Sequence, residues 1–159
     1  LLRETNFPTN DTRKNIFRDG QTKYKGFVLG TVNLRPHWQN IKGKKVDASA
    51  HTKGGKFKKL HTESKRLLKM HDPSFKFTTI QFNKNQQASK HKDAKNVGVS
   101  YIIGLGSYTG GLLKIYDLED KNPKDNNIRN KFKSFNGSIH YHEVTPFKGE
   151  RYTLVYFKV

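Results

Sequence analysis

The sequence predicts a mainly β fold, a sandwich or barrel of short strands that is backed by a helix. In the second half of the chain, strand-like segments follow one another closely. Some alternate between apolar and polar residues and others are continuously apolar, and both patterns are typical of strands. Glycines and prolines separate the segments as turns do, and one segment of helical period precedes them. The predicted strand segments are 75–82, 99–106, 112–117, 138–144 and 150–159.

The first half of the chain begins with a polar segment and a strand. Residues 1–25 are rich in turn formers, and Phe7, Ile16 and Phe17 are the expected packing points. The β-branched residues of "GFVLGTVNL" (26–34) predict a strand.

A long basic loop and a helix are predicted next. Residues 35–55 carry many lysines and the only tryptophan, and loops of this length are often functional. Apolar residues then recur near helical period, so we expect a helix over 56–70 that "HDP" (71–73) ends. The densely mixed charges of residues 117–133 predict a charged loop.

The length of 159 residues, without an internal repeat, predicts one domain. Within the single domain 1–159, residues 1–74 are expected to be a supporting segment with a strand and a helix. Residues 75–159 are expected to form the core that carries the functional site.

Positive charge is the strongest feature of the composition. The chain has 31 basic and 13 acidic residues, a formal net charge of +18, which attracts polyanions, nucleic acid above all. We expect non-specific affinity for the phosphate backbone that weakens with salt, because no arginine-rich recognition helix or zinc finger is present. The absence of cysteine excludes disulfides and thiol nucleophiles.

No membrane partner is predicted, because no apolar run reaches the ~18 residues that a membrane span needs. No secretory signal heads the sequence, so an intracellular location, nuclear or in a phage or viral setting, is expected. The sequence makes no prediction about the oligomeric state.

A His-x-Asp pair lies in the lysine-rich stretch "SKHKDAKNVG" (89–98). On an extended segment His91 and Asp93 point to the same face, so both can reach one ion. Alone, the His-x-Asp pair is a weak motif, and a solvated charge run is the favoured interpretation. A second extended segment supplies His142, and two histidines with one carboxylate form the facial triad of non-haem Fe(II) oxygenases.

Arg151 and Thr153 follow on the last alternating segment and are expected on the same face. A planar guanidinium beside a hydroxyl suits bidentate capture of a carboxylate. The alternative for Arg151 is a salt bridge at the rim of a barrel, which does not explain the order His-x-Asp, His, Arg-x-Thr.

These motifs carry a family resemblance. "HKD" followed by "HEVTPFKGERYTLVYF" resembles the C-terminal half of a 2-oxoglutarate/Fe(II)-dependent dioxygenase, whose fold is a double-stranded β-helix (jelly-roll, cupin-like) core with helical support. "FTTIQFNKNQQASKHKDAKNVGVSYIIGLGSYTGG" most resembles the TET/JBP-like nucleic-acid base oxygenases of phages, viruses and protists. The resemblance covers Phe75 to Phe157, about half of the chain.

The resemblance implies that His91, Asp93 and His142 bind Fe(II). Arg151 would hold the distal carboxylate of 2-oxoglutarate, assisted by Thr153. The other requirements are O2 and ascorbate as reductant.

One position departs from the pattern of related prolyl hydroxylases. Their tyrosine in the second core strand, which helps to hold the co-substrate, falls around Gly104 here. Tyr101 or Ser100 is the expected substitute. His140 is expected either to support His142 or to face the substrate.

The resemblance and the charge together favour hydroxylation of a pyrimidine methyl group, thymine or 5-methylcytosine, in DNA more than in RNA. The expected nucleic-acid contacts are His37, Trp38, Lys90, Lys92, Lys95 and His140. A protein (prolyl) hydroxylase of the same superfamily is the alternative. A second alternative is a non-catalytic jelly-roll that binds nucleic acid or assembles with its own copies.

Overall fold

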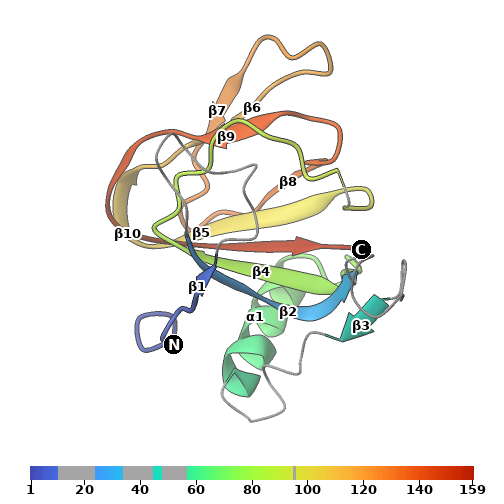
Figure 1. The fold of residues 1–159 in the computed structure, drawn as a ribbon, viewed down its shortest axis with the longest axis vertical. Helices are drawn as coiled ribbons and strands as arrows, with labels where there is room; N and C mark the ends of the chain where they lie inside the picture. Colours follow the sequence, from blue (N-terminus) through green and yellow to red (C-terminus); the bar gives the residue numbers. More distant parts are fainter. Residues whose placement is uncertain (11–23, 34–44, 48–56, 95) are drawn as a thin grey trace.

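The structure is a computed structural model that describes residues 1–10, 24–33, 45–47, 57–94 and 96–159 (Figure 1). Its one described helix is α1 (Lys58–His71). The strands are β1 (Thr9–Asn10), β2 (Tyr24–Asn33), β3 (Lys45–Asp47), β4 (Thr79–Lys84), β5 (Ser100–Gly110), β6 (Leu113–Ile115), β7 (Lys124–Asn126), β8 (Lys133–Phe135), β9 (His142–Val144) and β10 (Phe147–Phe157).

Two antiparallel sheets face each other. The larger sheet has the order β1-β2-β4-β10-β5-β8, with β3 paired to β2, and the smaller has the order β7-β6-β9. In Figure 1 the smaller sheet lies above the larger sheet, and α1 lies below the larger sheet. This arrangement confirms the predicted mainly β class with helical support, and the two sheets form its jelly-roll core. The described helix lacks the length and apolar character needed to cross a membrane.

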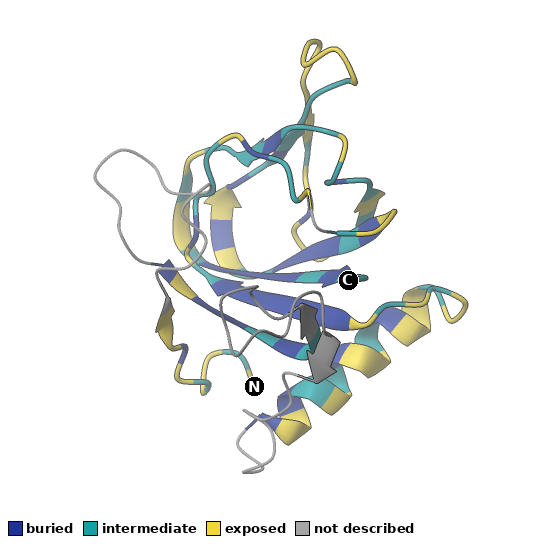
Figure 2. Cartoon of the chain, turned by 45° about the vertical axis from the view of Figure 1, so that its right-hand side comes forward, coloured by how far each residue is buried: buried dark blue, intermediate teal, exposed yellow. Residues whose placement is uncertain are grey.

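The central strands of the larger sheet are buried on both faces because they lie between α1 and the smaller sheet. On β10, Tyr152, Leu154 and Tyr156 belong to the core on the helix side. Arg151 and Thr153 alternate with them, and both are buried on the other side. Figure 2 shows buried residues along these strands and exposed residues on the outer turns of α1.

The helix packs through residues four apart in sequence. Leu60, Ser64 and Leu68 are the buried residues of α1, a spacing that places them on one face. The Tyr156 hydroxyl of β10 donates to the Ser64 carbonyl at 2.7 Å. Apolar burial of this kind contributes about 1.5–3 kcal/mol for each leucine-sized side chain. The predicted helix over 56–70 is therefore confirmed within two residues.

Two expected elements differ in the structure, and two of the expected packing residues lie outside the described residues. The predicted charged loop 117–133 contains β7, whose charged residues pair with β6 at an exposed sheet edge and therefore show no apolar alternation. The predicted strand over 138–144 is reduced to β9, because residues before His142 form a turn. Phe7 is buried against Phe27, whereas Ile16 and Phe17 lie outside the described residues.

Candidate functional site

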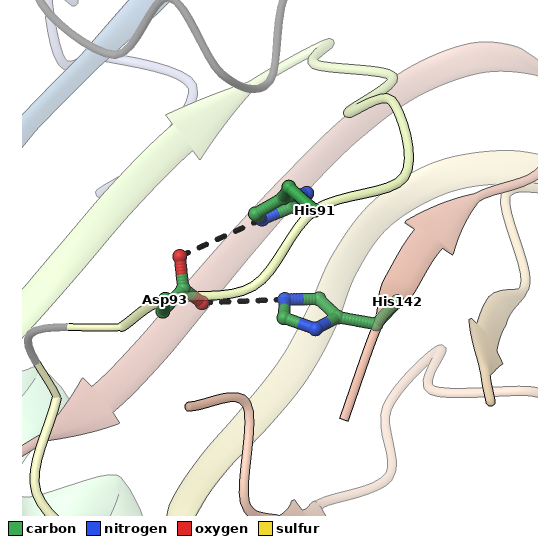
Figure 3. A group of neighbouring side chains, drawn as sticks. All are labelled: His91, Asp93 and His142. Carbon is green, nitrogen blue, oxygen red and sulfur yellow. Dashed lines mark ion pairs between the residues drawn. The ribbon is translucent and has the colours of Figure 1, made fainter. Parts of the chain in front are cut away.

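Three potential metal ligands meet at one edge of the smaller sheet. His91 and Asp93 lie on the segment between β4 and β5, and His142 begins β9 (Figure 3). His91 and His142 exchange two backbone hydrogen bonds, each of 3.0 Å, and the Asp93 N–H donates to the Gly137 carbonyl at 2.8 Å. The backbone therefore holds all three ligands, as the order of the motifs in the sequence suggests.

The ligand atoms converge on one point. They all lie within 4.8 Å of one another. Asp93 Oδ2 lies 3.2 Å from His142 Nε2, and Asp93 Oδ1 lies 3.5 Å from His91 Nε2. Gly137 packs closely against this group: a Cβ at this position would lie 3.1 Å from His142 Cε1 and 3.3 Å from Asp93 Oδ2, so any larger residue would push on two of the three ligands.

Hydrogen bonds to the backbone set the orientation of both imidazoles. His91 Nδ1 lies 2.6 Å from the Ser89 carbonyl, and His142 Nδ1 lies 2.9 Å from the His140 carbonyl. Since a carbonyl only accepts, each Nδ1 carries a hydrogen, and Nε2 is the ring atom that each histidine can offer to a metal at the centre. Two neutral imidazoles and one carboxylate with open positions are the ligand set of non-haem Fe(II) oxygenases, so the residues fit Fe(II).

The three ligands open into a cavity of about 480 Å³ between the sheets. This volume is in the range of small-molecule sites. Apolar side chains from several strands line part of it, and a group of polar residues from β4, the segment after β4, and β10 lines another part. The apolar lining includes Ile102, Leu113, Phe135, Val144 and Val155, and the polar lining includes Gln81, Asn83, Gln86, Arg151 and Thr153.

Arg151 is a buried cation in this cavity, with only 2% of its surface exposed. Its Nη2 donates to the Gly111 carbonyl at 3.1 Å and its Nη1 to the Gln86 carbonyl at 3.4 Å. No carboxylate of the described residues lies within 4.0 Å of it. Burial lowers the pKa of the guanidinium, and the neighbouring Tyr108 side chain opposes this shift. The guanidinium still remains charged at neutral pH.

Three buried hydrogen-bond donors gather around Arg151. Arg151 Nε, Gln86 Nε2 and the Tyr108 hydroxyl form no hydrogen bond of good geometry within the described part of the chain, although the Tyr108 hydroxyl lies near enough to Arg151 to raise its pKa. The guanidinium carbon lies 5.4 Å from the centre of the Tyr108 ring. Buried donors are rarely left without partners, and a carboxylate offers about four acceptor sites to groups of this kind. The cradle therefore fits the distal carboxylate of 2-oxoglutarate.

Tyr108 is a buried neighbour of Arg151 that the sequence did not reveal; it lies behind the cavity wall and does not line the cavity. A Cβ on Gly104 would lie 2.2 Å from the Tyr108 hydroxyl, so this hydroxyl occupies the space that a side chain at position 104 would need. The resemblance placed the expected tyrosine of the co-substrate site around position 104, and here the Tyr108 hydroxyl occupies the space beside Gly104 from four residues further along β5. The signal in the sequence was two glycines, Gly104 and Gly106, on the same face of one strand.

Tyr101 lies on the opposite face of the same strand. Its hydroxyl donates to Asp72 Oδ2 at 2.9 Å, and its ring packs against Phe75 and Phe132 near the end of α1. This placement corrects the expectation that Tyr101 contacts the co-substrate, because adjacent strand residues point to opposite faces. Ser100 is buried at the start of β5 and does not line the cavity either.

The predicted nucleic-acid contacts are placed unevenly. Lys92 lines the cavity, and its ammonium lies 4.5 Å from the centre of the Tyr141 ring. The Lys90 ammonium lies 2.6 Å from an Asp120 carboxylate oxygen.

His140 does not line the cavity, and its Nδ1 lies 2.7 Å from the Tyr116 carbonyl. It supports the metal site only through its own carbonyl, which orients His142. His37, Trp38 and Lys95 lie outside the described residues.

No protein-family model and no curated protein sequence matches the chain. Solved structures do share its fold. NgTET1 in complex with 5mC DNA matches with a TM-score of 0.56 and 19% sequence identity, over 84% of this chain and 60% of that chain. An oxidoreductase of the 2OG-Fe(II) oxygenase family from Burkholderia pseudomallei matches with a TM-score of 0.53 and 19% identity, over 84% of this chain and 67% of that chain. A prolyl-4-hydroxylase from Pseudomonas putida is less similar, with a TM-score of 0.45 and 16% identity over 94% of this chain and 76% of that chain, and the fold assignment does not depend on it.

The chain therefore has the fold of the 2OG-Fe(II) oxygenases, which confirms the expected jelly-roll. It spans only 60% of the length of the NgTET1 chain.

Proposed function

We propose that this chain is an Fe(II)- and 2-oxoglutarate-dependent dioxygenase that hydroxylates the methyl group of a pyrimidine base in DNA. One observation carries the enzyme class: a single cavity holds the ligand set of an Fe(II) oxygenase and a buried arginine that has no carboxylate partner among the described residues. A 2-oxo dicarboxylic acid satisfies both, with its keto-acid end at the metal and its far carboxylate at Arg151.

The residues of the chain supply binding, orientation and exclusion of water. When bound, iron supplies the oxidation in which 2-oxoglutarate and O2 become succinate and CO2, while the second oxygen atom enters a substrate C–H bond as a hydroxyl. His91, Asp93 and His142 would hold the metal, and with only three protein ligands they would leave positions for the co-substrate and O2. Apolar residues such as Ile102 and Val155 keep water from the space beside it.

The substrate assignment rests on three supporting features. The metal ligands are recessed, with His91 and His142 buried, so a base must leave the stack of a duplex to reach them. The net charge of +18 favours a polyanionic substrate. NgTET1, which shares the fold, was solved in complex with 5mC DNA.

A turnover assay with two substrate classes tests the proposal. The protein is incubated with Fe(II), ascorbate, O2 and 2-oxoglutarate, together with methylated duplex, unmethylated duplex or proline-containing peptides. Succinate release and nucleoside mass analysis are then measured. The expected result is succinate in proportion to a hydroxylated pyrimidine, with no product from Asp93→Ala.

Two other outcomes would change the assignment. Succinate release with peptides and not with DNA would make the chain a protein hydroxylase of the same class. A protein that binds neither iron nor 2-oxoglutarate would contradict the enzyme class and favour a non-catalytic jelly-roll.

A further inference from the structure

A row of buried polar side chains crosses the cavity wall beside Arg151. Gln81 and Asn83 lie on β4 and Thr153 lies on β10, where Thr153 is the register partner of Asn83. All three side chains line the cavity, and their exposed fractions are 5%, 9% and 4%. Polar groups this deeply buried must hydrogen-bond to one another or to a ligand.

The direction of each hydrogen bond in this row follows from one backbone carbonyl. Gln81 Nε2 lies 3.3 Å from the Phe82 carbonyl oxygen, which can only accept, so this amide atom is a nitrogen. The same nitrogen lies 3.1 Å from Asn83, so the Asn83 atom that it approaches must be the amide oxygen. The other Asn83 amide atom is then the nitrogen, which donates to Thr153 Oγ1 at 3.1 Å.

The relay leaves Thr153 with a hydrogen to give away. Its oxygen accepts from Asn83, and no acceptor for its own hydrogen is found within the described part of the chain. Thr153 is two residues from Arg151 on the same face of β10, and its register partner on β5 is Gly104, over which the Tyr108 hydroxyl lies.

We propose that Gln81 and Asn83 are positioning residues that fix the Thr153 hydroxyl as a hydrogen-bond donor to the carboxylate held by Arg151. This inference rests on the proposed function, because the carboxylate is that of the 2-oxo acid co-substrate. With Thr153 fixed in this way, its hydroxyl and the Arg151 guanidinium, two residues apart on the same face of β10, both present N–H or O–H groups to this end of the cavity. The site therefore favours a co-substrate with an ionised far end over one with a terminal amide, whose N–H groups would meet donors.

Binding of 2-oxoglutarate to the Mn(II)-loaded chain, measured by isothermal titration calorimetry, tests the relay without turnover. The variants are Asn83→Leu, Thr153→Val and their combination. A hydrogen bond to a charged group is expected to change the dissociation constant about tenfold or more, so each single variant should weaken binding by that factor. The dissociation constant of the double variant for 2-oxoglutarate should not exceed that of Thr153→Val, because Asn83 acts only through Thr153.

Three further variants make the test specific. Thr153→Ser keeps the hydroxyl and should bind 2-oxoglutarate within about twofold of the unsubstituted chain, a difference of about 0.4 kcal/mol. Gln81→Leu keeps Asn83 and allows its amide to turn over, so it should also weaken binding, and it replaces Asn83→Leu if that variant fails to fold. Thr109→Val makes the same chemical change at an exposed position of β5 and should leave the dissociation constant unchanged.

The outcomes separate the relay from the proposed function. If Asn83→Leu and Gln81→Leu bind 2-oxoglutarate as tightly as the unsubstituted chain, the relay is wrong. Additive losses in the double variant would also overturn it, because Asn83 would then contact the co-substrate directly. If the unsubstituted Mn(II)-loaded chain does not bind 2-oxoglutarate, the proposed function itself fails.

Discussion

Replacing Arg151 with methionine should stabilise the ligand-free protein while it removes co-substrate binding. The guanidinium is 2% exposed and has no carboxylate within 4.0 Å among the described residues. An uncompensated buried charge costs roughly 3–5 kcal/mol. The 3.1 Å bond to the Gly111 carbonyl returns about 1.5–3 kcal/mol, and the 3.4 Å bond to Gln86 returns little. The free energy of unfolding should therefore rise by about 1 kcal/mol, or roughly 2–4 °C in Tm for a chain of this size.

The same substitution should abolish the stabilisation by 2-oxoglutarate. At a ligand concentration of 100 times Kd, binding stabilises the folded state by about 2.7 kcal/mol, which corresponds to a rise in Tm of roughly 5–10 °C. Thermal unfolding followed by circular dichroism, with and without 2-oxoglutarate, measures both effects. Arg151→Met should start from a higher Tm and show no shift on addition of the ligand.

Arg129→Met is the matched control. Arg129 lies over the same Tyr108 ring, 5.8 Å from its centre, but is exposed. Its removal should change the free energy of unfolding by no more than about 0.5 kcal/mol and should leave the full ligand shift. A full 2-oxoglutarate shift in Arg151→Met would refute the assignment of this arginine. A ligand-free Arg151→Met protein several kcal/mol less stable would show that the guanidinium is a structural support.

Three further substitutions test other parts of the structure. Gly104→Ala places a methyl group on the Tyr108 hydroxyl and should lower Tm by several degrees, and adding Tyr108→Phe should recover part of that loss. Asp93→Ala should remove stoichiometric iron and all succinate formation without unfolding the chain, which metal analysis and circular dichroism would check. Tyr156→Phe should cost about 1 kcal/mol at neutral pH through the lost bond to Ser64. Burial raises the pKa of Tyr156 above its ordinary value of 10.0, so the contribution of its neutral form to stability is full below pH 10 and is lost as the pH rises further. In denaturant titrations, the free energy of unfolding of Tyr156→Phe should therefore fall less at alkaline pH than that of the unsubstituted chain.

The metal site was predictable because its residue types are rare and its spacing is local. His91 and Asp93 are two residues apart, and strand geometry alone places them on one face. His142 was identified by its residue type and by the order of the motifs. What no pattern contained was the pair of backbone hydrogen bonds between His91 and His142, which brings the two segments together. Long-range pairing of this kind depends on the whole sheet.

The co-substrate end was predicted only in part, because several of its residues are ordinary in sequence. Arg151 and Thr153 stood out by charge and position. Gln86 and Asn83 are two polar residues in a polar stretch, and only the structure shows that they are buried. Tyr108 was missed because a tyrosine was expected near Gly104 itself. The Tyr108 hydroxyl reaches the space beside Gly104 from a position four residues later on the same strand.

Side chains on β10 alternate between two environments, with one face of the strand in the apolar core and the other face in the cavity wall. Tyr152, Leu154 and Tyr156 pack in the core against α1, and Arg151, Thr153 and Val155 face the cavity. Because the larger apolar core lies on the helix side, polar groups can persist beside the smaller cluster of Ile102, Leu113 and Ile128 on the other side, at a cost that the larger core offsets. Substitutions at the even-numbered positions should therefore lower stability and leave the affinity for 2-oxoglutarate unchanged in the protein that remains folded. Those at positions 151 and 153 should change affinity and leave the fold intact, because a residue on one face of a strand contacts only the layer that it faces.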